Sequence, residues 1–446
     1  KMKIRTTSYR ISTLSKKDKR LTIDIDITLP NGNIIKTSAI IQLHPLAYFL
    51  GKIPNASFSL LYLSAIVYAI DRSVERKRYS VDGWSREFEV EIHIPEYEAL
   101  LQYRDLINKL LSFLTGDFWD CNFVGTASIP PIVYEQSAYF DGITGVSLFS
   151  GGLDSLIGAI DYMTNNPDGK IFLASHYDSN MTGPKSDQEK IELQFRKKFA
   201  GRYLHLPAIL IEPSISKETS CRSRSLMFIA IAQIVASYAK CNITIPENGS
   251  VSLNFPLSPS RRASCSTRTT HPIFLKQLQV LINVLGLYPN LVNPYEKMTK
   301  GEMVQSCSDK EFLLQIVADS NSCGKRNMHQ HMYDNRQATH CGHCMPCMYR
   351  KASLVGEIDN TTYGNRFITL FDKKKDKVSQ DFFAMLDFLK KDITRNEIKR
   401  ELHIAGMTDF SDIDEYVDLV VRTRAELIRM LQADNNSAIN NYMGWI

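Results

Sequence analysis

The chain has 446 residues, of which 44% are hydrophobic and 23% are charged. This balance excludes a disordered chain and predicts two or three domains with a large buried core. The formal net charge of +5 suits an anionic ligand, but it is too small to indicate direct nucleic-acid binding.

The apolar segments argue against membrane association. The two longest, 58–70 and 226–239, are too short to span a bilayer, and the first residues contain no apolar signal segment. We therefore expect a cytoplasmic protein. Its nine cysteines are not expected to form disulfides in that compartment, and their clustering indicates a metal site instead.

Residues 1–140 are expected to form an N-terminal α+β module. Residues 21–29 and 88–94 alternate apolar and polar side chains as half-buried strands do, and 33–43 follows a turn as a hairpin partner. Residues 98–114 have the apolar spacing of a helix. The module contains no chemical motif, so we interpret it as a scaffold or as a surface that docks a partner.

From residue 146 onwards, short apolar strands alternate with helical segments. This pattern predicts an α/β fold with a doubly wound parallel sheet. A further helix is expected over 271–286, with Thr270 as its N-cap. The expected strands are 146–149, 170–177, 204–211 and 243–245.

The most informative stretch is SGGLDS at residues 150–155, between an apolar strand and a helix. Paired glycines allow a tight turn whose backbone N–H groups approach a ligand, and the helix N-terminus favours a phosphate. The stretch is neither a Walker A loop nor a dinucleotide fingerprint, because GxxxxGK[ST] and the third glycine are absent. The carboxylate of Asp154 indicates Mg²⁺ or a positioned reacting group.

In this context SGGLDS resembles the PP-loop of the N-type ATP pyrophosphatases. The resemblance implies an enzyme that cleaves ATP to AMP and pyrophosphate and uses the AMP to activate a carbonyl or carboxylate oxygen. It also implies that the whole stretch holds the ATP phosphates and Mg²⁺. These residues are Ser150, Gly151, Gly152, Leu153, Asp154 and Ser155.

A second signal lies at residues 322–354. Cys341, Cys344 and Cys347 form CxxCxxC, and Cys323 supplies a fourth thiolate. Four thiolates suit a closed tetrahedral Zn²⁺ site, whose role is structural because no ligand position stays open. An iron–sulfur cluster is the alternative, because thiolates suit it as well.

The PP-loop followed by these cysteines resembles the QueC family, the 7-cyano-7-deazaguanine synthases, over about residues 145–355. CGHCMPCMYR, which ends at Arg350, matches the family's late motif. RSLMF resembles the helix whose arginine, here Arg224, faces the nucleotide. TKGEMV resembles the family's lysine–glutamate stretch, in which Lys300 would neutralise the phosphates or the leaving pyrophosphate. Alternatively, Thr299 and Glu302 form only a helix capping box.

Two features go beyond simple QueC proteins: the large terminal regions, and an insertion at 245–272 that contains PENG and STRTTHP. Both resemble the QatC group of QueC-like proteins, found in the Qat anti-phage defence system. The implied units are an N-terminal module at 1–140, a PP-loop ATP-binding domain at 141–310, a zinc-binding segment with the four cysteines at 311–358 and a C-terminal helical region at 359–446.

The QatC resemblance implies a specific reaction. ATP would adenylate a 7-carboxy-7-deazaguanine-like carboxylate, and the acyl group would pass to an amine, the N-terminus of a partner protein from the same defence operon. Plain nitrile synthesis with ammonia is one alternative. A tRNA-modifying PP-loop enzyme and a nucleotide-sensing scaffold without turnover are two others.

The ends of the predicted strands place further residues at the site, because ligands of open α/β sheets bind there. Ser175 and His176 end the second strand, where this fold contacts adenine, although His176 is equally read as a buried strand-end histidine. Glu247 and Asn248 follow the fourth strand and could pair with a purine-like base, unless PENG is only a turn.

The remaining predicted contacts lie at the end of the insertion. Arg268 and His271 would contact the substrate carboxylate or a phosphate, and the alternative for Arg268 is a surface position beside a helix cap. Catalysis is expected to depend mostly on positioning and charge neutralisation. The expected catalytic residues are Asp154, Ser155 and Lys300.

Overall fold

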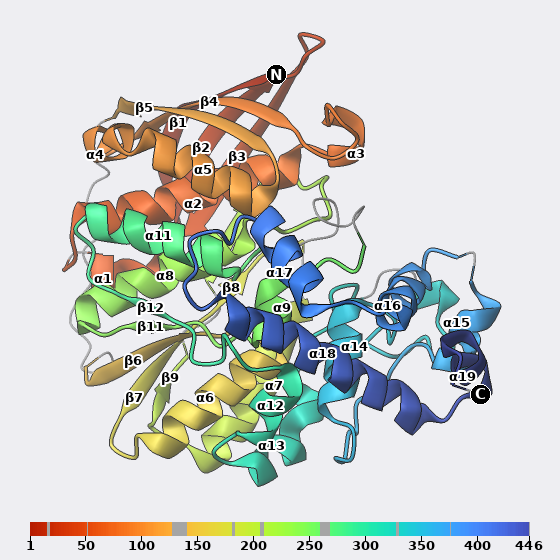
Figure 1. The fold of residues 1–446 in the computed structure, drawn as a ribbon. Helices are drawn as coiled ribbons and strands as arrows, with labels where there is room; N and C mark the ends of the chain where they lie inside the picture. Colours follow the sequence, from red (N-terminus) through yellow and green to blue (C-terminus); the bar gives the residue numbers. More distant parts are fainter. Residues whose placement is uncertain are drawn as a thin grey trace.

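Two β-sheets with helical layers between and around them form the body of the molecule, and a helical region that carries the C-terminus lies beside them (Figure 1). The computed structural model describes residues 1–15, 18–50, 52–126, 141–180, 183–205, 209–258, 268–326, 330–374 and 376–445.

The first sheet is mixed and has seven strands in the order β5-β4-β1-β2-β3-β10-β8. The predicted hairpin is confirmed, since Leu21 pairs with Ile41 and Ile25 with Thr37 in an antiparallel register. The outer pairs β1–β4, β4–β5 and β10–β8 are parallel. The strand bounds are β1 Met2–Ser15, β2 Asp18–Thr28, β3 Ile34–Gln42, β4 Glu87–Ile94, β5 Phe118–Gly125, β8 His176–Tyr177 and β10 Ile209–Pro213.

The second sheet has five strands in the order β12-β11-β6-β7-β9, and all of its pairs are parallel. The structure thus confirms a mixed α/β fold that contains a parallel sheet. The chain order reverses at β6, because β7 and β9 lie on one side of it and β11 and β12 on the other. Ligands of open α/β sheets bind beside such a reversal, at the carboxyl ends of the strands. The strand bounds are β6 Ile143–Leu148, β7 Lys170–Ala174, β9 Tyr203–Leu204, β11 Ile243–Thr244 and β12 Leu291–Val292.

Two of the predicted strands are wrong as single strands, because each is divided between the sheets. Residues 170–177 form β7 in the five-stranded sheet and then, after Ser175, β8 in the seven-stranded sheet. Residues 204–211 are likewise divided between β9 and β10, and β10 pairs antiparallel with β3. The 141–310 region therefore contributes two strands to the sheet of the N-terminal module. An apolar run of eight residues does not reveal such a crossing.

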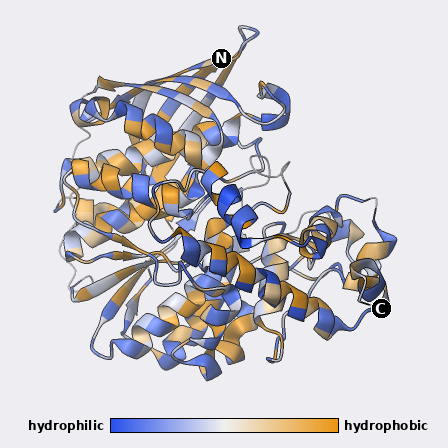
Figure 2. Ribbon diagram, in the orientation of Figure 1, coloured by the Kyte–Doolittle hydropathy of each residue, from blue (hydrophilic) through white to orange (hydrophobic). Residues whose placement is uncertain are grey.

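The layer between the sheets is rich in hydrophobic residues (Figure 2) and contains α2 (Asn55–Ser73) and α8 (Arg224–Ala239). Both helices are apolar around their whole circumference because they are covered on all sides, and they pack against each other. Their polar groups pair within the layer, where Gln233 Nε2 donates to Ser57 Oγ at 2.7 Å. No helix among the described residues combines the length and apolar character needed to cross a membrane.

Two details of the predicted helices are corrected. The expected helix over 98–114 is interrupted at Tyr103 and forms α4 (Tyr97–Gln102) and α5 (Arg104–Thr115). The N-cap of α11 (Pro272–Val284) is His271 and not Thr270, because the His271 ring accepts a hydrogen bond from the Ile273 N–H at 3.2 Å. Helices α6 (Leu153–Asn165), α7 (Gly183–Lys198), α12 (Lys300–Gln305) and α13 (Lys310–Ile316) pack in a separate core beside the five-stranded sheet.

The C-terminal region is helical, as expected, and has a hydrophobic core of its own that also includes side chains of α9 (Gly249–Leu253). The longest helix, α18, lies across the body of the molecule in Figure 1 and contacts α9 and α14. The helix bounds are α14 Met345–Ser353, α15 Phe367–Asp372, α16 Gln380–Lys390, α17 Arg395–Ile404, α18 Ile413–Asp434 and α19 Ser437–Met443.

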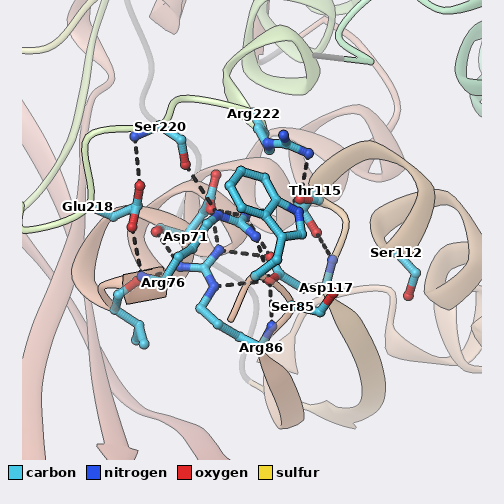
Figure 3. A network of polar contacts seen from close by, with 12 residues as sticks. Asp71, Arg76, Ser85, Arg86, Ser112, Thr115, Asp117, Glu218, Ser220 and Arg222 are labelled. Carbon is cyan, nitrogen blue, oxygen red and sulfur yellow. Dashed lines mark hydrogen bonds and ion pairs between the residues drawn. The ribbon is translucent and has the colours of Figure 1, made fainter. Parts of the chain in front are cut away.

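A buried network of charged side chains ties the N-terminal module to the segment that leads into α8 (Figure 3). Arg86 is fully buried and pairs with Asp71 at 2.5 Å and with Asp117 at 2.7 Å. Asp71 also accepts from the backbone N–H and the hydroxyl of Ser223, the N-cap residue of α8. The module thereby holds the start of α8 in place, and Arg224 is the first residue of that helix.

Candidate functional site

The SGGLDS stretch forms a tight turn between β6 and α6, at the strand where the sheet order reverses. Gly151 has φ +84°, and a Cβ there would lie 3.2 Å from the backbone N of Gln188, so this position requires glycine. Gly152 is the N-cap of α6 and provides no side-chain cap. The first turn of α6 therefore has no cap from its N-cap side chain, and backbone N–H groups at such a helix start are the donors that bind an anion.

Asp154 lies at the centre of a polar cluster at the carboxyl end of β6. Its carboxylate pairs with Lys300 Nζ and accepts from Asn248 Nδ2 at 2.7 Å. Asp154 and Lys300 are only 6% and 3% exposed, so the pair is shielded from water. The N-cap interaction of Asn248, whose Oδ1 accepts from Val251 N at 3.1 Å, orients its amide group towards Asp154.

Glu247 lies beside Asp154 and completes this cluster. Burial would raise the pKa of Asp154, but Lys300 and hydrogen bonds from Glu247 and Asn248 outweigh it and hold the pKa below its usual value. Burial and the adjacent Asp154 carboxylate raise the pKa of Glu247 well above its usual range, which favours the protonated form of Glu247 as a donor to Asp154. Two carboxyl groups that share one proton offer oxygen donors of the kind that Mg²⁺ prefers.

His176, predicted at the adenine, and Arg224, predicted at the nucleotide, touch each other. His176 Nε2 is 2.7 Å from the Ile211 carbonyl, to which it donates, so Nδ1 accepts from Arg224 Nε at 3.2 Å. Burial and the adjacent Arg224 lower the pKa of His176 to about 3, which keeps the ring neutral. His176 is thus a hydrogen-bonded buried histidine, as the alternative interpretation holds, and it orients a half-buried arginine at the start of α8.

Ser175 also has a partner that the sequence does not reveal. Its Oγ is 3.1 Å from the Phe149 carbonyl and 2.9 Å from His205 Nε2. His205 Nδ1 is in turn 3.0 Å from Glu192 Oε2. This chain of polar groups fixes the end of β7 against the residue that precedes the glycine turn.

Arg268 and His271 lie together, and both contact Phe113 of α5. The Arg268 guanidinium stacks on the Phe113 ring at 4.5 Å and donates to the Phe113 carbonyl at 3.2 Å. His271 packs against the same ring and caps α11, and burial followed by Arg268 lowers the pKa of His271 to about 3. Both residues line a small pocket beside α17, with Asn254 and Glu401. Residues 259–267 of the predicted insertion lie outside the described residues.

The four cysteines that the sequence singles out come together. Cys323 and Cys344 are 3.9 Å apart at their sulfurs, as are Cys341 and Cys347, and all four sulfurs lie within 4.8 Å of one another. A tetrahedral ion with bonds of about 2.3 Å separates its sulfur ligands by about 3.8 Å, so the four side chains fit one metal ion such as zinc. Backbone N–H groups of Cys341 and Cys344 donate to cysteine sulfurs at 3.3 Å, which favours thiolates.

The C-terminal region supports the Lys300 side of the site, which the sequence does not predict. Glu426 on α18 accepts from the Thr299 hydroxyl and from the Gly301 N–H at 3.3 Å. The capping box at Thr299 and Glu302 is also present, so this alternative interpretation of the stretch is confirmed without excluding the contact of Lys300 with Asp154. The contact of Glu426 with Thr299 cannot be predicted from a local sequence pattern, because the two residues are 127 positions apart in the chain.

Comparison with family models, curated proteins and solved structures finds no match for this chain. The site is therefore interpreted from its own geometry.

Replacing Cys344 by serine is expected to lower the bound metal from about one ion per chain to a small fraction, because the remaining three thiolates form an open and weaker site. Elemental analysis of the purified variant measures this, and a fall in melting temperature should accompany it. Cys241→Ser is the matched control, since Cys241 lies outside the cluster. An unchanged metal content in Cys344→Ser would show that the quartet does not hold the ion.

Proposed function

We propose that the chain binds ATP at the carboxyl end of β6. It would use the ATP to activate a carboxylate, whose acyl group is then transferred to an amine. The observation that carries this proposal is the buried pair of Asp154 and Lys300 directly behind the glycine turn. A cation and a carboxylate placed together at the switch point of a parallel sheet suit phosphate chemistry better than a purely structural role.

The proposed reaction has two steps. A carboxylate oxygen of the substrate attacks the α-phosphorus of ATP, and pyrophosphate leaves with the electrons of the broken P–O bond. The amine then attacks the acyl carbon, AMP leaves, and the amine loses a proton. The first step needs charge neutralisation more than acid–base chemistry, because negative charge accumulates on the leaving group.

Different residues around the glycine turn would bind the phosphates, the metal ion and the nucleotide. Lys300 would neutralise the phosphates, and the first turn of α6 would hold them through backbone N–H groups. Asp154 and Glu247 would hold Mg²⁺, which would supply further positive charge at the phosphates. Arg224, oriented by His176, would contribute a second cation at the nucleotide, because none of the described carboxylates forms an ion pair with it.

The finer assignments rest on the resemblance to QueC and QatC proteins. We propose a 7-carboxy-7-deazaguanine-like substrate, the N-terminal amine of a partner protein as acceptor, a role in anti-phage defence and a cytoplasmic location. We further propose Zn²⁺ at the cysteines, because four sulfurs this close together surround a single ion, whereas a four-iron cluster places each thiolate on a separate iron.

The experiment that tests the proposal incubates the full chain with ATP, Mg²⁺ and 7-carboxy-7-deazaguanine, with a candidate partner protein or with ammonium. AMP and pyrophosphate are quantified, and the intact mass of the partner is measured. A mass gain at the partner's N-terminus supports the protein-conjugating reaction, and conversion of the small molecule to an amide or nitrile supports ammonia as the acceptor. ATP binding without AMP formation under all of these conditions would overturn the enzymatic proposal in favour of a nucleotide-binding scaffold.

A further inference from the structure

One short segment, residues 320–326, joins the glycine turn directly to the cysteine cluster. The Asn321 N–H donates to the Gly151 carbonyl at 2.9 Å, and the Leu153 N–H donates to Ser322 Oγ at 3.3 Å. The next residue, Cys323, is one of the four cysteines. Asn321 and Ser322, which contact the turn, are therefore followed directly in the chain by a cysteine of the metal-binding cluster.

Two side chains of this segment carry buried donors that have no acceptor among the described residues. The Cys323 N–H donates to Asn321 Oδ1 at 2.9 Å, which sets the orientation of the amide and leaves Asn321 Nδ2 as the unpaired donor. Arg326 pairs with Asp187 through one terminal nitrogen, and its Nε has no acceptor among the residues that the structure describes. Buried donors without acceptors are costly, and an anion bound beside the turn is the kind of group that accepts from such donors.

Both donors belong to residues that surround the glycine turn. A Cβ on Gly151 would lie 3.2 Å from Asp187 Cβ, and Asp187 is the ion-pair partner of Arg326. A Cβ on Gly152 would lie 3.6 Å from the Asn321 carbonyl. The turn thus packs against α7 at Gly151 and against the 320–326 segment at Gly152.

We propose that Asn321 and Arg326 form a second wall of the phosphate-binding site, and that a metal ion at the cysteines holds this wall in place, so that metal and phosphate bind cooperatively. The identity of the anion rests on the proposed function. The coupling follows from the connectivity: an ion that joins Cys323 to residues 341–347 restrains the segment whose neighbours contact the turn. Without the ion, that segment keeps its hydrogen bonds to the turn and the ion pairs of Lys325 with Asp381 and of Arg326 with Asp187, but it loses the link to residues 341–347.

Asn321→Asp tests the wall in metal-loaded protein. Aspartate keeps the oxygen that accepts from the Cys323 N–H and the backbone N–H that binds Gly151, but it replaces the free donor by a negative oxygen. We expect binding of Mg²⁺–ATP and of inorganic pyrophosphate, measured by titration calorimetry, to weaken by about tenfold or more. Asn335→Asp is the matched control, because Asn335 is an exposed residue between Cys323 and Cys341 whose side chain caps a local turn at Gln337.

Metal depletion tests the coupling. Protein stripped with a chelator and shown to be folded by circular dichroism should bind pyrophosphate about tenfold more weakly than metal-loaded protein, a typical size for linkage between two sites. Because such coupling is reciprocal, saturating pyrophosphate should slow the transfer of metal to a chromogenic chelator, and this readout needs no catalytic activity. Asn321→Asp should abolish that slowing while it keeps the metal.

The outcomes separate this proposal from the proposed function. If wild type and Asn321→Asp bind ATP and pyrophosphate equally well, and metal content has no effect on either, the second wall is overturned although the nucleotide site stands. If metal-loaded wild type binds neither ligand, the proposed function fails and this inference fails with it. Weakened binding in Asn321→Asp together with slower metal release in wild type establishes both parts.

Discussion

Replacing Asp154 by asparagine is expected to lower the rate of AMP formation by about 10²–10³-fold, the usual cost of losing one electrostatic contact to a reacting group. The amide removes the negative charge that positions Lys300 and offers one oxygen fewer to Mg²⁺. The rate is measured as AMP released from ATP in the presence of Mg²⁺ and the carboxylate substrate. Asp154→Ala should lose activity in the same way.

The same variant is expected to stay folded. In the native cluster the neighbouring carboxylate of Asp154 helps to keep Glu247 protonated. Once that charge is removed, Glu247 can ionise and take over as the counterion of Lys300, so the buried lysine keeps a partner. A change of only a few degrees in the melting temperature would agree with this exchange.

Asp161→Asn is the matched control, because Asp161 lies on the same helix and is also a hydrogen-bonded carboxylate. It accepts from the Tyr295 hydroxyl at 2.6 Å and from the Ser308 N–H at 2.7 Å, about two helical turns beyond Asp154 on α6. We expect this variant to lose some stability and to keep the AMP-forming rate. A rate in Asp154→Asn as high as in this control would remove Asp154 from the reaction and the glycine turn from the active site.

Much of the site can be predicted from local sequence patterns. SGGLDS and CxxCxxC each concentrate their chemistry within a few residues, and the alternation of strands and helices places the first of them at a strand end. The convergence of Asp154, Glu247 and Asn248 follows from one rule, since β6 and β11 are neighbours in a parallel sheet and their carboxyl ends meet. The contact of Lys300 with Asp154 brings two predicted site residues together, but the sequence does not predict the ion pair itself, and the capping box is present beside it.

Other features depend on contacts that no local pattern contains. The exchange of β8 and β10 into the N-terminal sheet depends on the pairing of residue 211 with residue 41. Arg326 meets Asp187 across 139 positions, and Glu426 meets Thr299 across 127. His271 was expected at the substrate and instead caps a helix, because a ring nitrogen can accept a backbone N–H as hydroxyl and carboxamide caps do. Contacts between residues so far apart in the chain depend on how the whole molecule packs, which a local sequence pattern does not show.

The second large effect is expected in the buried network of Figure 3, where Asp71→Ala should lower the free energy of unfolding by about 3–5 kcal/mol. The substitution leaves Arg86, which is fully buried, with one carboxylate fewer and removes the group that binds Ser223. Equilibrium unfolding in urea measures the loss. Asp24→Ala serves as the control, because Asp24 is only half-buried and its ion pair with Arg10 lies at the surface, so a loss of about 1 kcal/mol or less is expected.

The pH dependence of the stability difference between wild type and Asp71→Ala shows whether the charge of Asp71 causes that difference. Burial would raise the pKa of Asp71, but Arg86 and Arg76 outweigh it and hold the pKa below its usual value. A carboxylate whose pKa is lower in the folded chain than in the unfolded chain stabilises the fold above its unfolded pKa of about 3.9, and this contribution disappears as the pH falls through the folded value. The stabilities of wild type and Asp71→Ala should therefore differ by a constant amount above about pH 5 and converge in stronger acid. A difference that persists unchanged at low pH would mean that Asp71 contributes through its shape and packing rather than through its charge.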